Sequence, residues 1–305
     1  MKKINLLFSI AALVCMTACS NQEFTDISAE RHELQYISRT PIENEAQLES
    51  FYVWAQRDNA WQFEKVLVSR QGDTWKSNET NLWQAGTYNF YAITGTEPSS
   101  VTANLNGDFV ISVGENETDL DLMTAVSSGI AYPVTEGDPS PVAFHFYHEK
   151  AQIEITVKTS AQLLDGVIIK SITLSNFYKG GTFTRTFLGS GIYRGTWKFG
   201  TDTDSWKTGS EQFLESGSSY KPLEGYMIPA QQLSGVTLSF DYKIGSESYS
   251  KEFELTKATG SGNWLEAGII YDYNFTIRPE GIVFDGITMD EWKESHSGGD
   301  INIEE

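Results

Sequence analysis

The chain of 305 residues has only two cysteines, Cys15 and Cys19, and both lie in its first nineteen residues. The rest of the chain therefore offers no thiol for a disulfide, for a thiolate metal site or for nucleophilic catalysis. Its stability must come from packing alone, and a chain of this length can bury sizeable cores.

Basic residues are also scarce, since 22 lysines and arginines stand against 41 aspartates and glutamates, a formal net charge of −19 at pH 7. Such an acidic surface repels the phosphates of nucleic acids and the head groups of anionic lipids. We therefore expect no nucleic-acid partner. Beyond the first nineteen residues no apolar run approaches the length needed to span a membrane.

The N-terminus has the layout of a removable export signal. Two lysines precede an apolar run over residues 4–16, which is too short for a permanent membrane helix. Two small residues then lead into Cys19, in a pattern that resembles the lipobox of bacterial lipoproteins. We expect a signal peptide over residues 1–18 and lipidation of Cys19, whose acyl chains would hold the protein on a membrane. An ordinary signal peptide that happens to contain Cys19 is the alternative.

Alternation of apolar and polar residues dominates the second half of the chain. It is clearest over residues 153–157, 236–244 and 271–277. A period of two is typical of strands whose sheet is buried on one face, and helical periodicity is scarce. Two hairpins are also expected, one around Asn106-Gly107 and one around Gly245–Ser248, because these turn residues separate alternating runs. Together these patterns predict an all-β fold built of β-sandwiches.

Three of the eight prolines lie between residues 132 and 141. Proline removes a backbone donor from a sheet and restricts the residue before it to extended geometry, so this stretch predicts a boundary between domains. We therefore expect a tether with a first strand over residues 19–40, an N-terminal β-sandwich over 41–138, a C-terminal β-sandwich over 139–290 and a tail over 291–305.

Residues for catalysis do not occur in a convincing pattern. His145 and His148 are three residues apart in a predicted strand, so they point to opposite faces and do not share a metal ion. Paired acidic residues such as Glu252 and Glu254 fit a solvated sheet face better than an acid and base pair. The sequence therefore predicts no enzyme, no cofactor and no metal site.

Eight tryptophans are present, and four of them lie near residues that favour loops. An exposed aromatic face can stack on a sugar, which makes these four candidate glycan contacts: Trp61, Trp75, Trp197 and Trp206. Tryptophan also closes the ends of sandwich cores, so a purely structural role is the competing interpretation.

Several short motifs follow one another in a set order along the chain. They are the lipobox at Cys19, Tyr88–Ala92, Asp121–Ala125, Val142–Ala151 continued by alternating residues to Val157, Gly180–Phe183, Gly225–Gln231, Trp264–Gly268, Tyr271–Tyr273 and a late Trp292. In this order they resemble the fimbrillin family, the lipoprotein pilins and related surface adhesins of Bacteroidota. The resemblance covers essentially the whole chain.

The resemblance implies two tandem transthyretin-like antiparallel β-sandwich domains that assemble by strand exchange. In the family a protease cuts after a basic residue, an N-terminal strand leaves, and a strand of another subunit fills the groove. Here the removable strand would include Leu34–Ile37, and cleavage would follow Arg39 or Arg31. The donor strand would carry Ile301 and Ile303 of the tail.

The function implied by the resemblance is a structural or adhesive subunit of a cell-surface fimbria, delivered to the outer membrane by lipid at Cys19. Its partners would be other fimbrial subunits, together with a ligand on a host or bacterial surface. The alternative is a monomeric surface lipoprotein that binds glycans through the four tryptophans named above.

Overall fold

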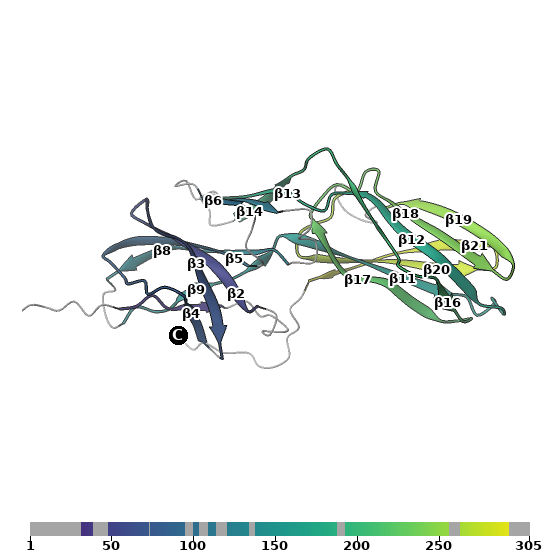
Figure 1. Cartoon of the computed structure of the whole chain (residues 1–305), viewed down its shortest axis with the longest axis horizontal. Coiled ribbons are helices and arrows are strands. Elements are labelled where there is room, and N and C mark those ends of the chain that lie inside the picture. Colours follow the sequence, from purple (N-terminus) through teal and green to yellow (C-terminus); the bar gives the residue numbers. More distant parts are fainter. Residues whose placement is uncertain are drawn as a thin grey trace, which may run out of the picture. The chain divides into compact units, whose positions relative to one another are not determined.

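The computed structural model describes residues 32–38, 48–72, 74–94, 100–103, 109–113, 121–133, 138–187, 193–255 and 263–292. Every regular element in these ranges is a β-strand, which confirms the expected all-β fold (Figure 1). The sites expected at Cys19, Arg31, Arg39, Ile301 and Ile303 fall outside the described residues.

Eight strands form the largest sheet. They are β1 (Tyr36–Ser38), β2 (Ser50–Arg57), β3 (Ala60–Gln71), β4 (Thr74–Ser77), β5 (Gly86–Thr94), β8 (Met123–Tyr132), β9 (Val142–Phe144) and β10 (Tyr147–His148). Their order across the sheet is β10-β8-β5-β2-β3-β4-β1-β9. Only His145 and Phe146 separate β9 from β10 in the chain, so the two ends of this order stay close together and the sheet folds over on itself.

The folded sheet encloses a core that is rich in aromatic rings. We call it the N-terminal core; its largest fully buried members are Tyr88, Phe51, Phe90 and Phe144. Strand β2 is apolar on both faces, because Phe51 and Val53 point into this core while Trp54 points to a different cluster. A strand that is covered on both faces loses the simple apolar–polar alternation, which explains the continuous aromatic sequence of β2.

The C-terminal half contains two further sheets. Their strands are β11 (Lys150–Thr159), β12 (Val167–Phe177), β15 (Asp204–Lys207), β16 (Gln212–Leu214), β17 (Ser219–Pro229), β18 (Thr237–Ile244), β19 (Glu247–Glu254), β20 (Ile269–Arg278) and β21 (Gly281–Glu291). One sheet has the order β17-β11-β20-β21, and the other has the order β15-β12-β18-β19 with β16 also paired to β12. Apolar residues from both sheets, among them Ile155, Phe240 and Phe275, form one buried C-terminal core. This half is a β-sandwich, as the alternation predicts.

The hairpin expected near Gly245 is confirmed. Strands β18 and β19 are antiparallel, and Ile244 lies opposite Glu247, so Gly245 and Ser246 alone make the turn. Gly245 has a φ of 59°, a conformation that glycine adopts at little cost and that a two-residue hairpin with glycine in first place requires.

Two of the strand pairs are parallel rather than antiparallel. Strand β11 runs parallel to β20, and β1 runs parallel to β9. Alternation shows which face of a strand is buried but not the direction of its neighbour, so this feature was not accessible from the sequence pattern.

A four-stranded sheet combines segments from both halves of the chain. Its strands are β6 (Ser100–Ala103), β7 (Phe109–Val113), β13 (Gly181–Phe187) and β14 (Tyr193–Lys198), in the order β14-β13-β7-β6. Phe183 of β13 packs with Trp54 and Tyr91 of the large sheet in a third cluster, which we call the outer core. The four-stranded sheet therefore covers the face of β2 and β5 that is turned away from the N-terminal core.

Strand pairing does not divide at residue 138, where the sequence suggested a boundary. Strands β9 and β10 follow this residue and yet complete the first sheet, and β13 pairs with β7 from the N-terminal half. The division into two domains at residues 41–138 and 139–290 stays a prediction. The transthyretin-like character of these domains stays a prediction as well.

Candidate functional site

The expected removable segment, Leu34–Ile37, lies within the described residues and leads into strand β1, which lies inside the large sheet. Tyr36 is antiparallel to Trp75 of β4 on one side and parallel to Val142 of β9 on the other. The amide of Val142 donates a hydrogen bond of 2.7 Å to the carbonyl of Gln35. Because β1 is bonded on both sides, its departure would leave β4 and β9 with unpaired backbone groups.

Two side chains of this segment enter the N-terminal core. Leu34 is 4% exposed and Tyr36 is 2% exposed, whereas Gln35 between them faces solvent. The ring of Tyr36 stacks on Phe144, with ring centroids 6.2 Å apart and an interplanar angle of 13°. Burial of an apolar side chain such as Leu34 contributes roughly 1.5–3 kcal/mol, and the ring of Tyr36 adds further apolar burial, so these residues hold β1 in its groove.

The hydroxyl of Tyr36 has no hydrogen-bond partner among the described residues. Burial raises the pKa of this phenol well above its ordinary value, and the nearby charge of Glu33 adds to the effect. The hydroxyl is therefore neutral at any physiological pH. The sequence does not reveal this feature, because it depends on what surrounds the ring in the fold.

A buried ion pair lies where the chain leaves β10. Arg185 Nη1 of β13 donates to Glu149 Oε1, and Thr124 Oγ1 donates to the same oxygen at 2.5 Å. The indole of Trp197 donates to the backbone carbonyl of Glu149 at 2.9 Å. Desolvation raises the pKa of Glu149, against the lowering effects of Arg185 and Thr124. The pair ties the β13–β14 hairpin to the large sheet.

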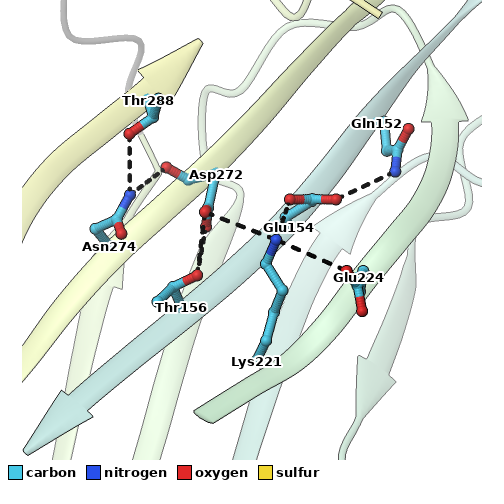
Figure 2. A network of polar contacts seen from close by, with 8 residues as sticks. All are labelled: Gln152, Glu154, Thr156, Lys221, Glu224, Asp272, Asn274 and Thr288. Atoms are coloured by element: carbon cyan, nitrogen blue, oxygen red, sulfur yellow. Dashed lines mark hydrogen bonds and ion pairs between the residues drawn. The ribbon is translucent and has the colours of Figure 1, made fainter. Parts of the chain in front are cut away.

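The outer face of the β17-β11-β20-β21 sheet carries a polar network, which Figure 2 shows from close by. Lys221 Nζ donates to Glu154 Oε2 at 2.5 Å, and carboxylate oxygens of Asp272 and Glu224 lie at 3.9 and 4.0 Å. Thr156 Oγ1 donates to Asp272 at 2.9 Å. The hydrogen bond to Glu154 is the main cause that raises the pKa of Lys221. These are cross-strand pairs on a solvated face, and we assign no binding role to them.

The two histidines of the FHFYH stretch have different neighbours. His148 Nδ1 lies 2.7 Å from Asp121 Oδ2, and its ring stacks on Trp292 at a centroid distance of 4.1 Å. His145 packs edge-on against Tyr147. Within the described ranges, no group of three or more His, Cys, Asp or Glu residues is arranged to hold a metal ion. The same residues include no helix that is long and apolar enough to cross a membrane.

The four candidate tryptophans are half-buried and pack on three different cores. Trp61 and Trp197 contact the outer core, Trp75 the N-terminal core and Trp206 the C-terminal core. Trp264, which was not among the candidates, is 49% exposed. Tryptophans that close the end of a core pack in this way. Glycan contact by the four tryptophans stays a prediction.

A sequence model of the fimbrillin-like family matches residues 40–292, from the residue after Arg39 to the last described residue. The chain belongs to the fimbrillin-like family. The resemblance seen in the order of the sequence motifs is thereby confirmed. A search of curated proteins found no match to this fimbrillin-like protein.

Solved structures of Bacteroides proteins share the fold. A candidate cell adhesion protein of Bacteroides uniformis is 17% identical, with a TM-score of 0.56 over 87% of this chain and 99% of that one. A fimbrial protein of Bacteroides vulgatus is 11% identical, with a TM-score of 0.55 over 86% and 99%. A candidate cell adhesion protein of Bacteroides ovatus is 12% identical, with a TM-score of 0.56 over 88% and 99%. At these identities the similarity concerns the fold alone.

Proposed function

We propose that this fimbrillin-like protein is a structural or adhesive subunit of a cell-surface fimbria, exported as a lipoprotein and assembled by strand exchange. Membership of the family supports the role of a fimbrial or adhesive subunit at the cell surface. The observation that carries strand exchange is β1, a three-residue strand inserted between β4 and β9. Its Tyr36, and Leu34 just before it, are buried in the core. The role is structural and needs neither a catalytic centre nor a cofactor.

Of the two candidate cleavage sites, Arg39 fits the position of β1 better. The strand ends at Ser38, so a cut after Arg39 separates β1 from the rest of the sheet. A cut after Arg31 leaves β1 covalently attached to the strands that it pairs with. The family match also begins at residue 40, the first residue after the favoured cut.

Loss of β1 would open a groove with unpaired backbone groups along β4 and β9 and with apolar pockets beneath them. A strand from another subunit can satisfy both, which is β-augmentation. In the tail, Ile301 and Ile303 have the same spacing of two residues as Leu34 and Tyr36. Before cleavage, lipid at Cys19 would hold the precursor on the outer membrane. If neither arginine is cut, Cys19 would be a permanent anchor.

Proteolysis of the purified Cys19→Ala precursor tests this function. A trypsin-like protease should cut after Arg39 and yield oligomers that survive SDS, and deletion of residues 296–305 should abolish them. Arg39→Ala should block assembly, whereas the matched variant Arg31→Ala should assemble like the parent. A protein that is cut cleanly after Arg39 and stays monomeric would overturn strand exchange.

The second candidate function, a monomeric lipoprotein that binds glycans through Trp61, Trp75, Trp197 and Trp206, keeps its place only as the alternative. All four rings are in contact with core residues, which reduces the aromatic surface left for a sugar.

A further inference from the structure

Buried tyrosines in this protein differ in one respect, the bonding of the hydroxyl. Three of the six buried tyrosines in the described residues accept a hydrogen bond from a backbone amide: Tyr88 from Gln84 at 2.9 Å, Tyr242 from Ile282 at 3.0 Å and Tyr271 from Glu266 at 2.9 Å. Tyr36 has no such partner within the described residues, although its hydroxyl is fully enclosed. The contrast with Tyr88 is informative because both rings belong to the N-terminal core.

The ring of Tyr36 is nevertheless well packed. It stacks on Phe144, and the ring centroid of Phe144 lies 5.6 Å from that of Phe51, which in turn lies 5.0 Å from that of Trp75. Phe144, Phe51 and Trp75 form an aromatic pocket under β1, and Tyr36 occupies it. The pocket accepts the ring but offers the hydroxyl no hydrogen bond from the described residues, so the hydroxyl loses its bonds to water without a replacement there.

We propose that this aromatic pocket is a subsite of the acceptor groove that favours an apolar side chain without a hydroxyl, and that the Tyr36 hydroxyl weakens the hold of the resident β1. The occupant to which we assign it is the tail of a second copy of this chain, through Ile301 or Ile303. An isoleucine can fill the pocket without the desolvation cost of a phenol. The inference rests on the proposed strand exchange and gives that exchange a direction. The resident β1 is held less tightly in the groove than the incoming strand that replaces it.

Tyr36→Phe tests the role of the hydroxyl in the uncut precursor, independently of assembly. Removal of the unbonded hydroxyl should slow hydrogen exchange of the β1 amides and of Val142 by roughly 5- to 100-fold. Tyr88→Phe, which removes a bonded hydroxyl from the same core, should speed exchange instead. Unchanged or faster exchange in Tyr36→Phe would overturn the inference.

Tyr273→Phe is the matched control, since its hydroxyl also lacks a partner among the described residues but lies in the C-terminal core. It should stabilise that core and leave the exchange of the β1 amides as in the parent. An equal effect of both variants on β1 would mean that the effect is global, and would overturn the assignment to the pocket.

Binding of a synthetic peptide of residues 293–305 to protein cut after Arg39 tests the subsite. The peptide should bind Tyr36→Phe protein more slowly than the parent by roughly 5- to 100-fold, because β1 leaves less readily. Replacement of Ile301 or Ile303 in the peptide by Thr should weaken binding at one position, where a hydroxyl enters the pocket. If the parent binds peptide and neither change matters, the inference fails while strand exchange stands. If the cut parent neither binds peptide nor forms oligomers, strand exchange itself fails.

Discussion

Arg185 and Glu149 form a buried hydrogen-bonded ion pair between β13 and the residue that follows β10. The two side chains are 4% and 7% exposed and lie 36 residues apart in the chain. A Cβ atom at Gly195 would collide with the Glu149 carboxylate, so the absence of a side chain there permits the close approach of β14. The pair holds a hairpin of the C-terminal half on the large sheet.

Arg185→Met should lower the free energy of unfolding by about 3–5 kcal/mol at neutral pH, because it leaves the Glu149 carboxylate buried without a counter-charge. Urea denaturation measures this loss. The double variant Glu149→Met with Arg185→Met should recover much of the stability, and a double variant no more stable than the single one would contradict this account.

The stability of the Arg185→Met variant should also depend on pH. Burial raises the pKa of Glu149 above its ordinary value of 4.5, and loss of the arginine removes an opposing effect. A carboxyl whose pKa is raised on folding favours the folded state at low pH and opposes it as pH rises through the folded-state pKa. The deficit relative to the parent should therefore be smaller at about pH 5 than at about pH 8. Urea denaturation at both values checks the sign, and an equal deficit would exclude Glu149 as its source.

Lys221→Met, in the network of Figure 2, should change the free energy of unfolding by less than about 1 kcal/mol. Lys221 is 34% exposed, so water and salt screen its attraction to Glu154 and Asp272. The measurement is urea denaturation at low and high salt, where the difference between variant and parent should shrink with added salt. A loss as large as that of Arg185→Met would show that the network contributes more than a solvated face does.

Cys19→Ala should abolish incorporation of labelled palmitate in cells, because the acyl chains require the thiol at the end of the lipobox. Cys15→Ala is the matched control and should retain the label, since Cys15 belongs to the part removed as signal peptide. Label retained in Cys19→Ala would refute lipidation at this residue.

Trp75→Ala should lower the free energy of unfolding by about 2–4 kcal/mol, because the indole packs on Phe51 with ring centroids 5.0 Å apart. Trp264→Ala should lower the free energy of unfolding by less, since this ring is about half exposed.

A sugar array tests the alternative function, glycan binding. Binding by the parent that is lost in folded variants of Trp61, Trp75, Trp197 or Trp206 would support it, and no binding by the parent would end it.

The strands with one buried face were predictable from the sequence, because burial imposes a period of two. Ile153, Ile155 and Val157 of β11 alternate with polar residues and are all buried. Strand β2 was harder to interpret, because its two faces lie in two different cores and the period is lost. The turn at Gly245 was predictable because its backbone conformation is a local property of glycine.

The partners across each sheet were not predictable. Alternation does not show that β13 pairs with β7 from the other half, or that β11 and β20 are parallel. The pairing of Arg185 with Glu149 follows from that arrangement and has no local signature. Contacts between distant segments depend on which sheets the whole chain can close, and no short window contains that information.

By itself, the sequence determined that this is an all-β chain with an N-terminal lipobox pattern and a short strand between two arginines, since these depend on composition and local pattern. Only the tertiary structure decided that this strand is held between β4 and β9 and that the buried Tyr36 hydroxyl finds no partner in the described part of the chain. The physical reason is that a hydrogen bond requires a group brought into range by folding. At Tyr36 the fold brings aromatic rings, contributed by Phe51, Trp75 and Phe144.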